Sequence, residues 1–207
     1  MKVLLINGSA HEKGCTFTAL DEMIKVFESE GIETELIQVG KKEVRGCIAC
    51  GSCKKNGRCV FDDIVNETAD KLKDADGLVI GSPVYFSSPN GNLLSFLDRL
   101  FYSAPYSMQM KVGASVVSCR RGGNSTTFDV LNKYLTYGGM AVASSTYWNF
   151  IHGFTAEDAK KDLEGLQTMR NLARNMVFMM KAIADAKEKY GLPEQEKNSR
   201  TCFHDGK

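Results

Sequence analysis

The sequence predicts one α/β domain built on a doubly wound parallel sheet of five strands. Two apolar runs, residues 2–8 and 76–83, are too short for core helices and end in turn residues, which is typical of strands buried on both faces. Strands and helical patterns alternate along most of the chain. Because parallel strands are joined by long right-handed crossovers, this alternation predicts helices on both faces of the sheet.

The chain opens with an expected strand, helix and strand. The run KVLLING, residues 2–8, is the first strand, and a helical pattern follows from Thr16 to about Glu30, with Gly31 just past its end. Residues 32–39 alternate like a second strand. These three elements form the first crossover unit of the sheet.

The later elements continue in the same order. We expect helix 63–75, strand 76–83, helix 91–104, strand 111–118, helix 124–137 and strand 139–147. A long helix over about 156–189 follows. Thr155 can cap it, with Asp158 three positions on in capping-box style, and Leu163 and Leu166 begin its apolar stripe. Five strands in this arrangement predict the flavodoxin-like order 2-1-3-4-5.

The length and composition fit a single domain. The chain has 207 residues, 43% of them hydrophobic, which is enough to bury a full core. We assign residues 1–190 to the domain, with a cysteine-rich loop insertion at 46–60, and residues 191–207 to a polar tail that is loose or leans on a neighbouring subunit. The net charge of +1, spread along the chain, argues against a nucleic-acid partner.

The N-terminus and the hydropathy predict a cytoplasmic protein. MKVLLINGSA has only four consecutive apolar residues, too few for a signal peptide, and no stretch approaches the roughly 18 apolar residues of a membrane span. We therefore expect no membrane association. In the reducing cytosol, clustered cysteines are expected to bind metal or to be catalytic rather than to form disulfides.

The loop after the first strand has the composition of a phosphate-binding loop. In NGSAHEKGCT, Gly8 and Gly14 let backbone N–H groups approach an anion, Ser9 and Thr16 add hydroxyl donors, and the next helix presents its positive N-terminus. The segment matches neither a Walker loop nor GxGxxG. An ordinary Gly-Ser turn is the alternative. Ligands of this architecture bind at the carboxyl ends of the strands, which favours a monophosphate.

Two further loops are expected to converge beside this one. The third strand leads into GSPVYFSSPNG, where Ser82, Pro83 and Tyr85 lie at the position of a ring system bound at the sheet edge. The fourth strand leads into SCRRGGNST, a Gly-rich loop that opens a helix. In the alternative interpretation, Tyr85 and Phe86 are core aromatics.

Taken together and in order, NGSAHEKGCT, DDIV, GSPVYF, NGNLLSFLDR and RRGGNSTTFDVLNKYLTYGGM resemble the NAD(P)H-dependent FMN reductases of flavodoxin-like fold. The resemblance covers residues 1–148 and implies FMN as cofactor, with NAD(P)H as a co-substrate. It implies a phosphate site at Ser9, His11, Gly14, Cys15 and Thr16. It implies a ring site against Pro83, Val84, Tyr85, Phe86 and the loop formed by Cys119, Arg120, Arg121, Gly122 and Gly123. The family often carries Arg at the position of His11 and Asn at that of Cys15, so the implied contact there is through the backbone.

Four cysteines lie in the segment GCIACGSCKKNGRC, with the spacing Cys47-x2-Cys50-x2-Cys53-x5-Cys59. Structural zinc sites usually join two separated pairs, which this run lacks, whereas bacterial ferredoxins draw three iron-sulfur ligands from a similar C-x2-C-x2-C run. The spacing therefore favours an iron-sulfur cluster over zinc. In the nearby FLDR, Asp98 and Arg99 are expected to be a structural or interface pair.

Within the flavodoxin-like group, this cysteine run and its position resemble the iron-sulfur flavoproteins. The resemblance implies that the four cysteines ligate a 4Fe-4S cluster and that the protein is a homodimer or homotetramer. The preferred function is an electron-transfer flavoprotein that couples FMN to the cluster, with a protein or small-molecule donor, ferredoxin or NAD(P)H. The alternative is an NAD(P)H-dependent FMN or quinone reductase whose cysteines are free, zinc-bound or redox-sensing. No acid-base constellation is apparent, so the site is the cofactor pair itself.

Overall fold

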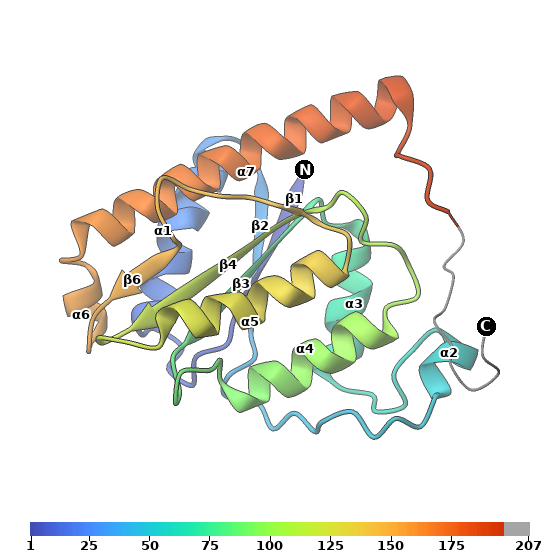
Figure 1. The fold of residues 1–207 in the computed structure, drawn as a ribbon, viewed down its shortest axis with the longest axis horizontal. Helices are drawn as coiled ribbons and strands as arrows, with labels where there is room; N and C mark the ends of the chain where they lie inside the picture. Colours follow the sequence, from blue (N-terminus) through green and yellow to red (C-terminus); the bar gives the residue numbers. More distant parts are fainter. Residues whose placement is uncertain (197–207) are drawn as a thin grey trace, which may run out of the picture.

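A computed structural model of the chain describes residues 1–196, in which a six-stranded parallel sheet lies between two layers of helices (Figure 1). The main path of the sheet is β2-β1-β3-β4-β5, and β6 pairs with the far end of β4. The predicted order 2-1-3-4-5 is therefore confirmed. The strands are β1 (Lys2–Asn7), β2 (Glu33–Gln38), β3 (Gly77–Pro83), β4 (Val112–Cys119), β5 (Ala141–Val142) and β6 (Phe150–His152).

Helices cover both faces of the sheet, and each face has its own apolar core. Along β1, Val3 and Leu5 pack under α1 and α7, whereas Leu4 and Ile6 pack against α3, α4 and α5. A strand buried on both faces explains the continuous apolar run that predicted it. The helices are α1 (Cys15–Ser29), α2 (Ser52–Asn56), α3 (Ile64–Asp74), α4 (Gly91–Ser103), α5 (Asn124–Tyr137), α6 (Ala156–Ala159) and α7 (Leu163–Tyr190). The short helix α2, inside the cysteine segment, was not predicted.

The predicted strand 139–147 is wrong in its length. Only β5, two residues long, pairs with the first half of β4, and β6 takes up the same edge further along. Between them the chain leaves the sheet, and Asn149 bridges the gap by donating its amide to Ser115 O at 3.0 Å. Polar groups of residues 144–146 bond instead to α7, through Asn175, Asn171 and the Thr168 carbonyl.

The predicted helix over 156–189 is wrong as a single element, because it is divided into α6 and α7. The capping box of Thr155 and Asp158 is confirmed. Asp162 is the N-cap residue of the second helix, α7. Its carboxylate accepts hydrogen bonds from Gly165 N at 2.9 Å and from His152 N at 2.7 Å. Leu163 consequently lies outside the apolar stripe and is exposed.

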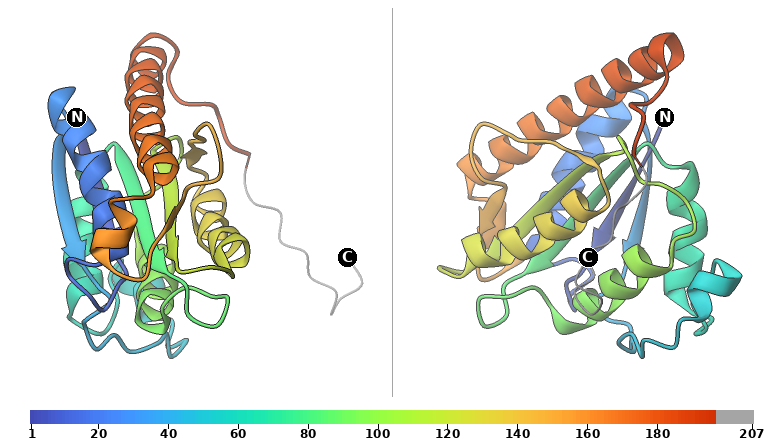
Figure 2. Two further views of the ribbon diagram at one scale, coloured as in Figure 1. Left: turned by 90° about the vertical axis from the view of Figure 1, so that its left-hand side faces the viewer. Right: turned by 45° about the vertical axis from the view of Figure 1, so that its right-hand side comes forward.

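The C-terminal half of α7 projects beyond the sheet (Figure 2), and most of its side chains there are exposed. Of the predicted tail 191–207, the structure describes residues 191–196, where Pro193 O accepts a hydrogen bond from Gln109. Residues 197–207 lie outside the described part of the chain. None of the helices within 1–196 is long and apolar enough to cross a membrane.

The Asp162 cap can be tested by substitution. Asp162→Ala should lower the free energy of unfolding by about 1–3 kcal/mol, because a helix cap and a second backbone hydrogen bond are lost together. Urea unfolding followed by circular dichroism measures this. Asp185→Ala, at an exposed position of the same helix, is the control and should change stability by less than about 0.5 kcal/mol. Equal losses in both variants would contradict the capping role.

Candidate functional site

A cavity of about 500 Å³ lies at the carboxyl ends of β1, β3 and β4. Its volume is within the range of small-molecule and cofactor sites. Three loops that the sequence predicted to converge here do so, and a fourth segment, after β6, completes the wall. The lining residues are Ser9, His11, Lys13, Gly14, Cys15, Thr16, Pro83, Val84, Tyr85, Ser118, Cys119, Arg120, Gly153, Phe154, Thr155 and Ala156.

The loop after β1 is held by its own polar groups. Asn7 Oδ1 accepts from Ser9 N at 3.0 Å, and Ser9 Oγ accepts from His11 N at 3.1 Å. Gly14 is the N-cap residue of α1, and no side chain caps this helix. The first turn of α1 therefore borders the cavity with amide groups that no side chain occupies, which suits an anion.

Two cationic side chains at the cavity strengthen its preference for an anion. Lys13 and Arg120 line it and are exposed to solvent. Deeper in the wall, the Thr16 and Ser118 hydroxyls form a buried hydrogen bond of 2.8 Å that ties α1 to the end of β4. The residues present thus fit a phosphate group by charge and by free donors.

The chain after β2 passes very close to the backbone of the loop after β1. A Cβ atom on Gly40 would overlap the carbonyl group of Gly8 and the carbonyl carbon of Ser9. In addition, Gln38 Nε2 donates to Ser9 O at 2.6 Å. The segment after β2 therefore supports the loop after β1 from behind, and it can do so only because residue 40 has no side chain.

The two cysteines of this cavity are neutral thiols. Cys15 Sγ donates to Thr155 O at 3.1 Å and lies 3.5 Å from Gly153 O. Burial is the main cause that raises the pKa of both Cys15 and Cys119. Since the ordinary thiol pKa already lies above neutrality, both stay protonated at pH 7. They shape the wall and do not act as thiolates.

The loop after β3 presents aromatic side chains to solvent. Tyr85 is 42% exposed and Phe86 is fully exposed, so the alternative that they are core aromatics is wrong. A bridge between Tyr85 and Ser88 closes the turn, and Phe86 and Ser87 have positive φ angles of 50° and 59°. Left-handed backbone at non-glycine residues is strained and recurs at binding sites.

Some predicted binding residues support the loops without lining the cavity. Ser82 is buried, and its hydroxyl donates to Pro83 O and accepts from Asn90 N. Gly123, with φ 83°, would bring a Cβ within 2.8 Å of Ser87 Oγ. The loops after β3 and β4 therefore touch at this glycine. Phe86 and Gly122 also lie outside the lining, and a role in binding for all four residues stays a prediction.

Sequence reasoning missed one wall of the cavity. It also omitted Lys13, which lies within the segment NGSAHEKGCT and whose positive charge could have indicated a role in binding an anion. Residues 153–156 could not be placed from sequence, because they reach the cavity only through the pairing of His152 with Cys119 at the end of β4. The Thr155 capping box was visible, but its position in space was not.

The four cysteines of the segment 46–59 line a second, small cavity of about 20 Å³ beside α4. Cys47 and Cys50 are exposed, and Cys53 and Cys59 are half-buried. Within residues 1–196, no three His, Cys, Asp or Glu side chains are grouped closely enough to hold a metal ion. The donor set nevertheless suits an iron-sulfur cluster, which takes four thiolates. In the described chain this cavity shares no lining residue with the first one.

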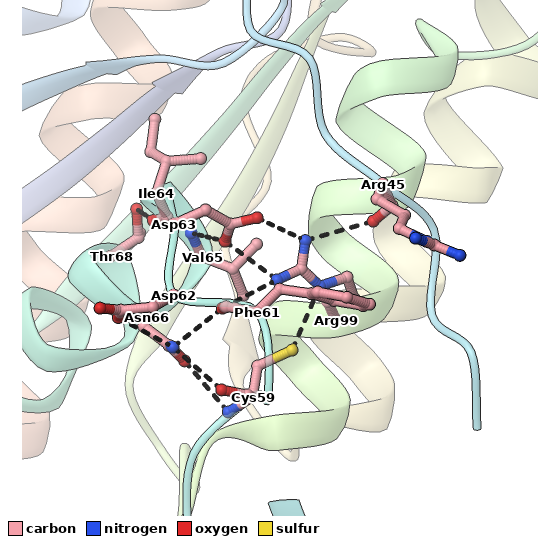
Figure 3. A network of polar contacts seen from close by, with 10 residues as sticks. All are labelled: Arg45, Cys59, Phe61, Asp62, Asp63, Ile64, Val65, Asn66, Thr68 and Arg99. Carbon is pink, nitrogen blue, oxygen red and sulfur yellow. Dashed lines mark hydrogen bonds and ion pairs between the residues drawn. The ribbon is translucent and has the colours of Figure 1, made fainter. Parts of the chain in front are cut away.

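A buried arginine anchors the cysteine segment (Figure 3). Arg99 is 1% exposed, and its guanidinium forms a bidentate pair with Asp63 at 2.7 and 2.9 Å. Its Nε donates to Cys59 Sγ at 3.3 Å. Burial opposes the charge of Arg99, but the hydrogen bonds to Asp63 and Cys59 outweigh it and raise the pKa of the guanidinium. Asp98 and Arg99 both make structural contacts, as expected, but not with each other: Asp98 accepts from the Tyr134 hydroxyl, and adjacent helix residues point apart.

A protein family and individual relatives both match this chain over most of its length. A family model described as NADPH-dependent FMN reductase matches residues 1–155. An iron-sulfur flavoprotein of Methanocaldococcus jannaschii is 35% identical over 194 residues, covering 88% of this chain and 99% of the relative.

Solved structures agree on the fold. RosB, solved with bound 8-demethyl-8-formylriboflavin-5'-phosphate, has a TM-score of 0.70 at 17% identity, covering 99% of this chain and 92% of that chain. An NAD(P)H:quinone oxidoreductase from Methanothermobacter marburgensis has a TM-score of 0.63 at 15% identity, covering 84% of this chain and 94% of that chain. At these identities the likeness concerns the fold alone.

The support of the first loop by Gly40 gives a test of the site's construction. Gly40→Ala should lower the free energy of unfolding by about 1–3 kcal/mol, because backbone atoms have to move to admit the methyl group. Gly91→Ala is the matched control: nothing lies within 4 Å of its Cβ position and it sits in a helix, so it should be neutral or slightly stabilising. Thermal and urea unfolding measure both. A Gly40→Ala protein as stable as wild type would contradict the close approach.

Proposed function

The chain belongs to the NADPH-dependent FMN reductase family and is a flavin-dependent oxidoreductase, and we propose that FMN binds in the cavity at the carboxyl ends of β1, β3 and β4. The observation that carries the assignment is the uncapped first turn of α1 beside Lys13 and Arg120. Open sheets of this type bind ligands at the carboxyl ends of the strands where the strand order reverses, which here is between β1 and β3. The cavity is also large enough for a mononucleotide.

The proposal assigns the phosphate and the ring of the cofactor to different residues of this site. Ser9, Gly14 and Thr16 would hold the phosphate, together with the backbone at His11 and Cys15. Pro83, Val84 and Tyr85 would support the ring from the β3 side, with the 119–123 loop facing them. When bound, the flavin supplies hydride and single-electron chemistry, while the protein fixes its orientation and excludes water.

We further propose that Cys47, Cys50, Cys53 and Cys59 hold a 4Fe-4S cluster. Support comes from the four thiols that line one cavity and from the name of the relative in Methanocaldococcus jannaschii. A cluster would supply one-electron steps and a flavin two-electron steps, so the pair would convert between them. Ferredoxin or NAD(P)H would be the donor. Because the two cavities of one chain are separate, exchange within a homodimer or homotetramer is part of this proposal.

The alternative is an NAD(P)H-dependent FMN or quinone reductase without a cluster. It is favoured by the lack of a grouped set of metal ligands in residues 1–196. In that case the thiols are free, zinc-bound or redox-sensing.

Flavin release and a charge substitution test the first cavity. Heating the purified protein should release FMN, and Lys13→Gln should weaken FMN binding by about five- to tenfold, as for one exposed charge-assisted hydrogen bond. Riboflavin, which lacks the phosphate, should bind both proteins equally. Fluorescence titration measures both affinities. Lys73→Gln is the control, since Lys73 is exposed in the last turn of α3 and does not line the cavity. Release of FAD or riboflavin, or equal weakening of both flavins, would overturn the assignment.

Iron analysis decides between the two functions. After anaerobic reconstitution, we expect about four iron and four sulfide per chain, lost in Cys50→Ala and retained in Cys119→Ala, whose cysteine lies in the other cavity. The visible absorption of the cluster is a second readout. Wild-type protein without iron that is rapidly reduced by NADPH would leave the reductase without a cluster as the function.

A further inference from the structure

The side chain of Arg99 is fully engaged at the base of the cysteine segment. Both terminal nitrogens bond Asp63, and they also donate to the backbone carbonyls of Arg45 and Phe61. The remaining nitrogen, Nε, donates to Cys59 Sγ at 3.3 Å. One cation thus connects α4, the N-terminus of α3 and both ends of the cysteine segment (Figure 3).

Cys59 differs from the other three cysteines in its surroundings. In the described part of the chain, it is the one of the four whose sulfur accepts a hydrogen bond from a cationic side chain. Its backbone is fixed as well, because Asn66 accepts from Cys59 N at 3.0 Å and donates to Cys59 O at 3.1 Å. The sulfur therefore has a fixed position and a fixed donor.

A charged donor at a sulfur ligand has a direct electrostatic effect. An N–H group that points at sulfur stabilises negative charge on it, and added electrons increase that charge, so the donor favours the reduced state. Asp63 carries the opposite charge but contacts the far side of the guanidinium, so it acts from a greater distance and opposes Arg99. Because Arg99 is 1% exposed, solvent screens its charge less than that of a surface cation.

We propose that Arg99 is the positioning residue of the cysteine site: it fixes the Cys59 sulfur and raises the reduction potential of the iron-sulfur group held there, against the opposing charge of Asp63. This inference rests on the proposed cluster. It adds a residue that is not one of the four proposed ligands to those that set the reduction potential of the cluster. A purely structural ion pair would only hold the segment in place.

The two members of the pair give shifts of opposite sign, which a structural role alone would not. Arg99→Gln removes the positive charge and should lower the midpoint potential of the cluster. Asp63→Asn removes the opposing negative charge and should raise it. Asparagine also caps helices well, so the start of α3, where Asp63 accepts from Val65 N, is preserved. Arg99→Lys keeps the charge and should lie closer to wild type than Arg99→Gln.

The experiment is an anaerobic dithionite titration followed by electron paramagnetic resonance on reconstituted full-length protein, after iron and sulfide have been measured. Each cluster gains one electron from dithionite. The flavin midpoint, recorded in the same sample, should not move. Arg174→Gln is the control, since Arg174 is exposed on α7, which covers the opposite face of the sheet from α3 and α4, and the change should leave the cluster potential unchanged.

The possible failures are distinguishable. Wild-type protein that takes up no iron would overturn the proposed cluster and this inference with it. A cluster whose potential is unmoved in Arg99→Gln, or shifts in the same direction in Arg99→Gln and Asp63→Asn, would overturn the inference alone. If Arg99→Gln does not fold, Asp63→Asn decides: a raised potential supports the inference, and an unchanged or lowered one overturns it.

Discussion

The position of β1 between β2 and β3 in the parallel sheet is the constraint on which the cavity at the strand ends depends. β1 pairs with β2 on one side and with β3 on the other, so the loops that leave β1 and β3 diverge at their carboxyl ends. The loop after β1 is supported from behind by a backbone segment that has to pass very close to it. Gly40 meets this need, because the chain after β2 touches the carbonyl of Gly8 there. Sheet order and one glycine together fix the position of the loop after β1.

Sequence periodicity predicted the strands and helices whose residues are buried continuously or at regular intervals. Residues such as Leu4 and Leu5 are buried on opposite faces, so β1 was visible as an apolar run. Prediction failed where the partner is distant in sequence. The chain after β5 leaves the sheet because α7 supplies groups such as Asn175, and Arg99 meets Asp63 across 36 positions. Thr155 and Asp162 each cap the start of a helix. The local sequence is compatible with one helix or with two, and tertiary packing decides between them.

The two cavities are built on different physical principles. The first cavity is lined by loops that follow strand ends and by the first turn of α1, and hydrogen bonds within the protein already hold its first loop, so less has to be ordered there when a ligand arrives. The cysteine segment has little apolar packing of its own, since Cys47 and Cys50 are exposed. A buried ion pair holds its base instead. Such pairs stabilise weakly but are costly to break singly, so this arrangement specifies the position of Cys59 more than it adds to stability.

The surroundings of the cysteines also bear on how electrons reach them. An apolar groove of about 640 Å³ between α4 and α5 borders the segment, and Cys47, Ala49 and Tyr102 belong to both the groove and the cysteine cavity. The cavity at the carboxyl ends of β1, β3 and β4 lies elsewhere, with residues that follow β6 in its wall. If the proposed cluster and FMN are bound, the cluster would lie beside the α4–α5 groove and the flavin beside the segment after β6. One-electron and two-electron partners would then meet different parts of the surface.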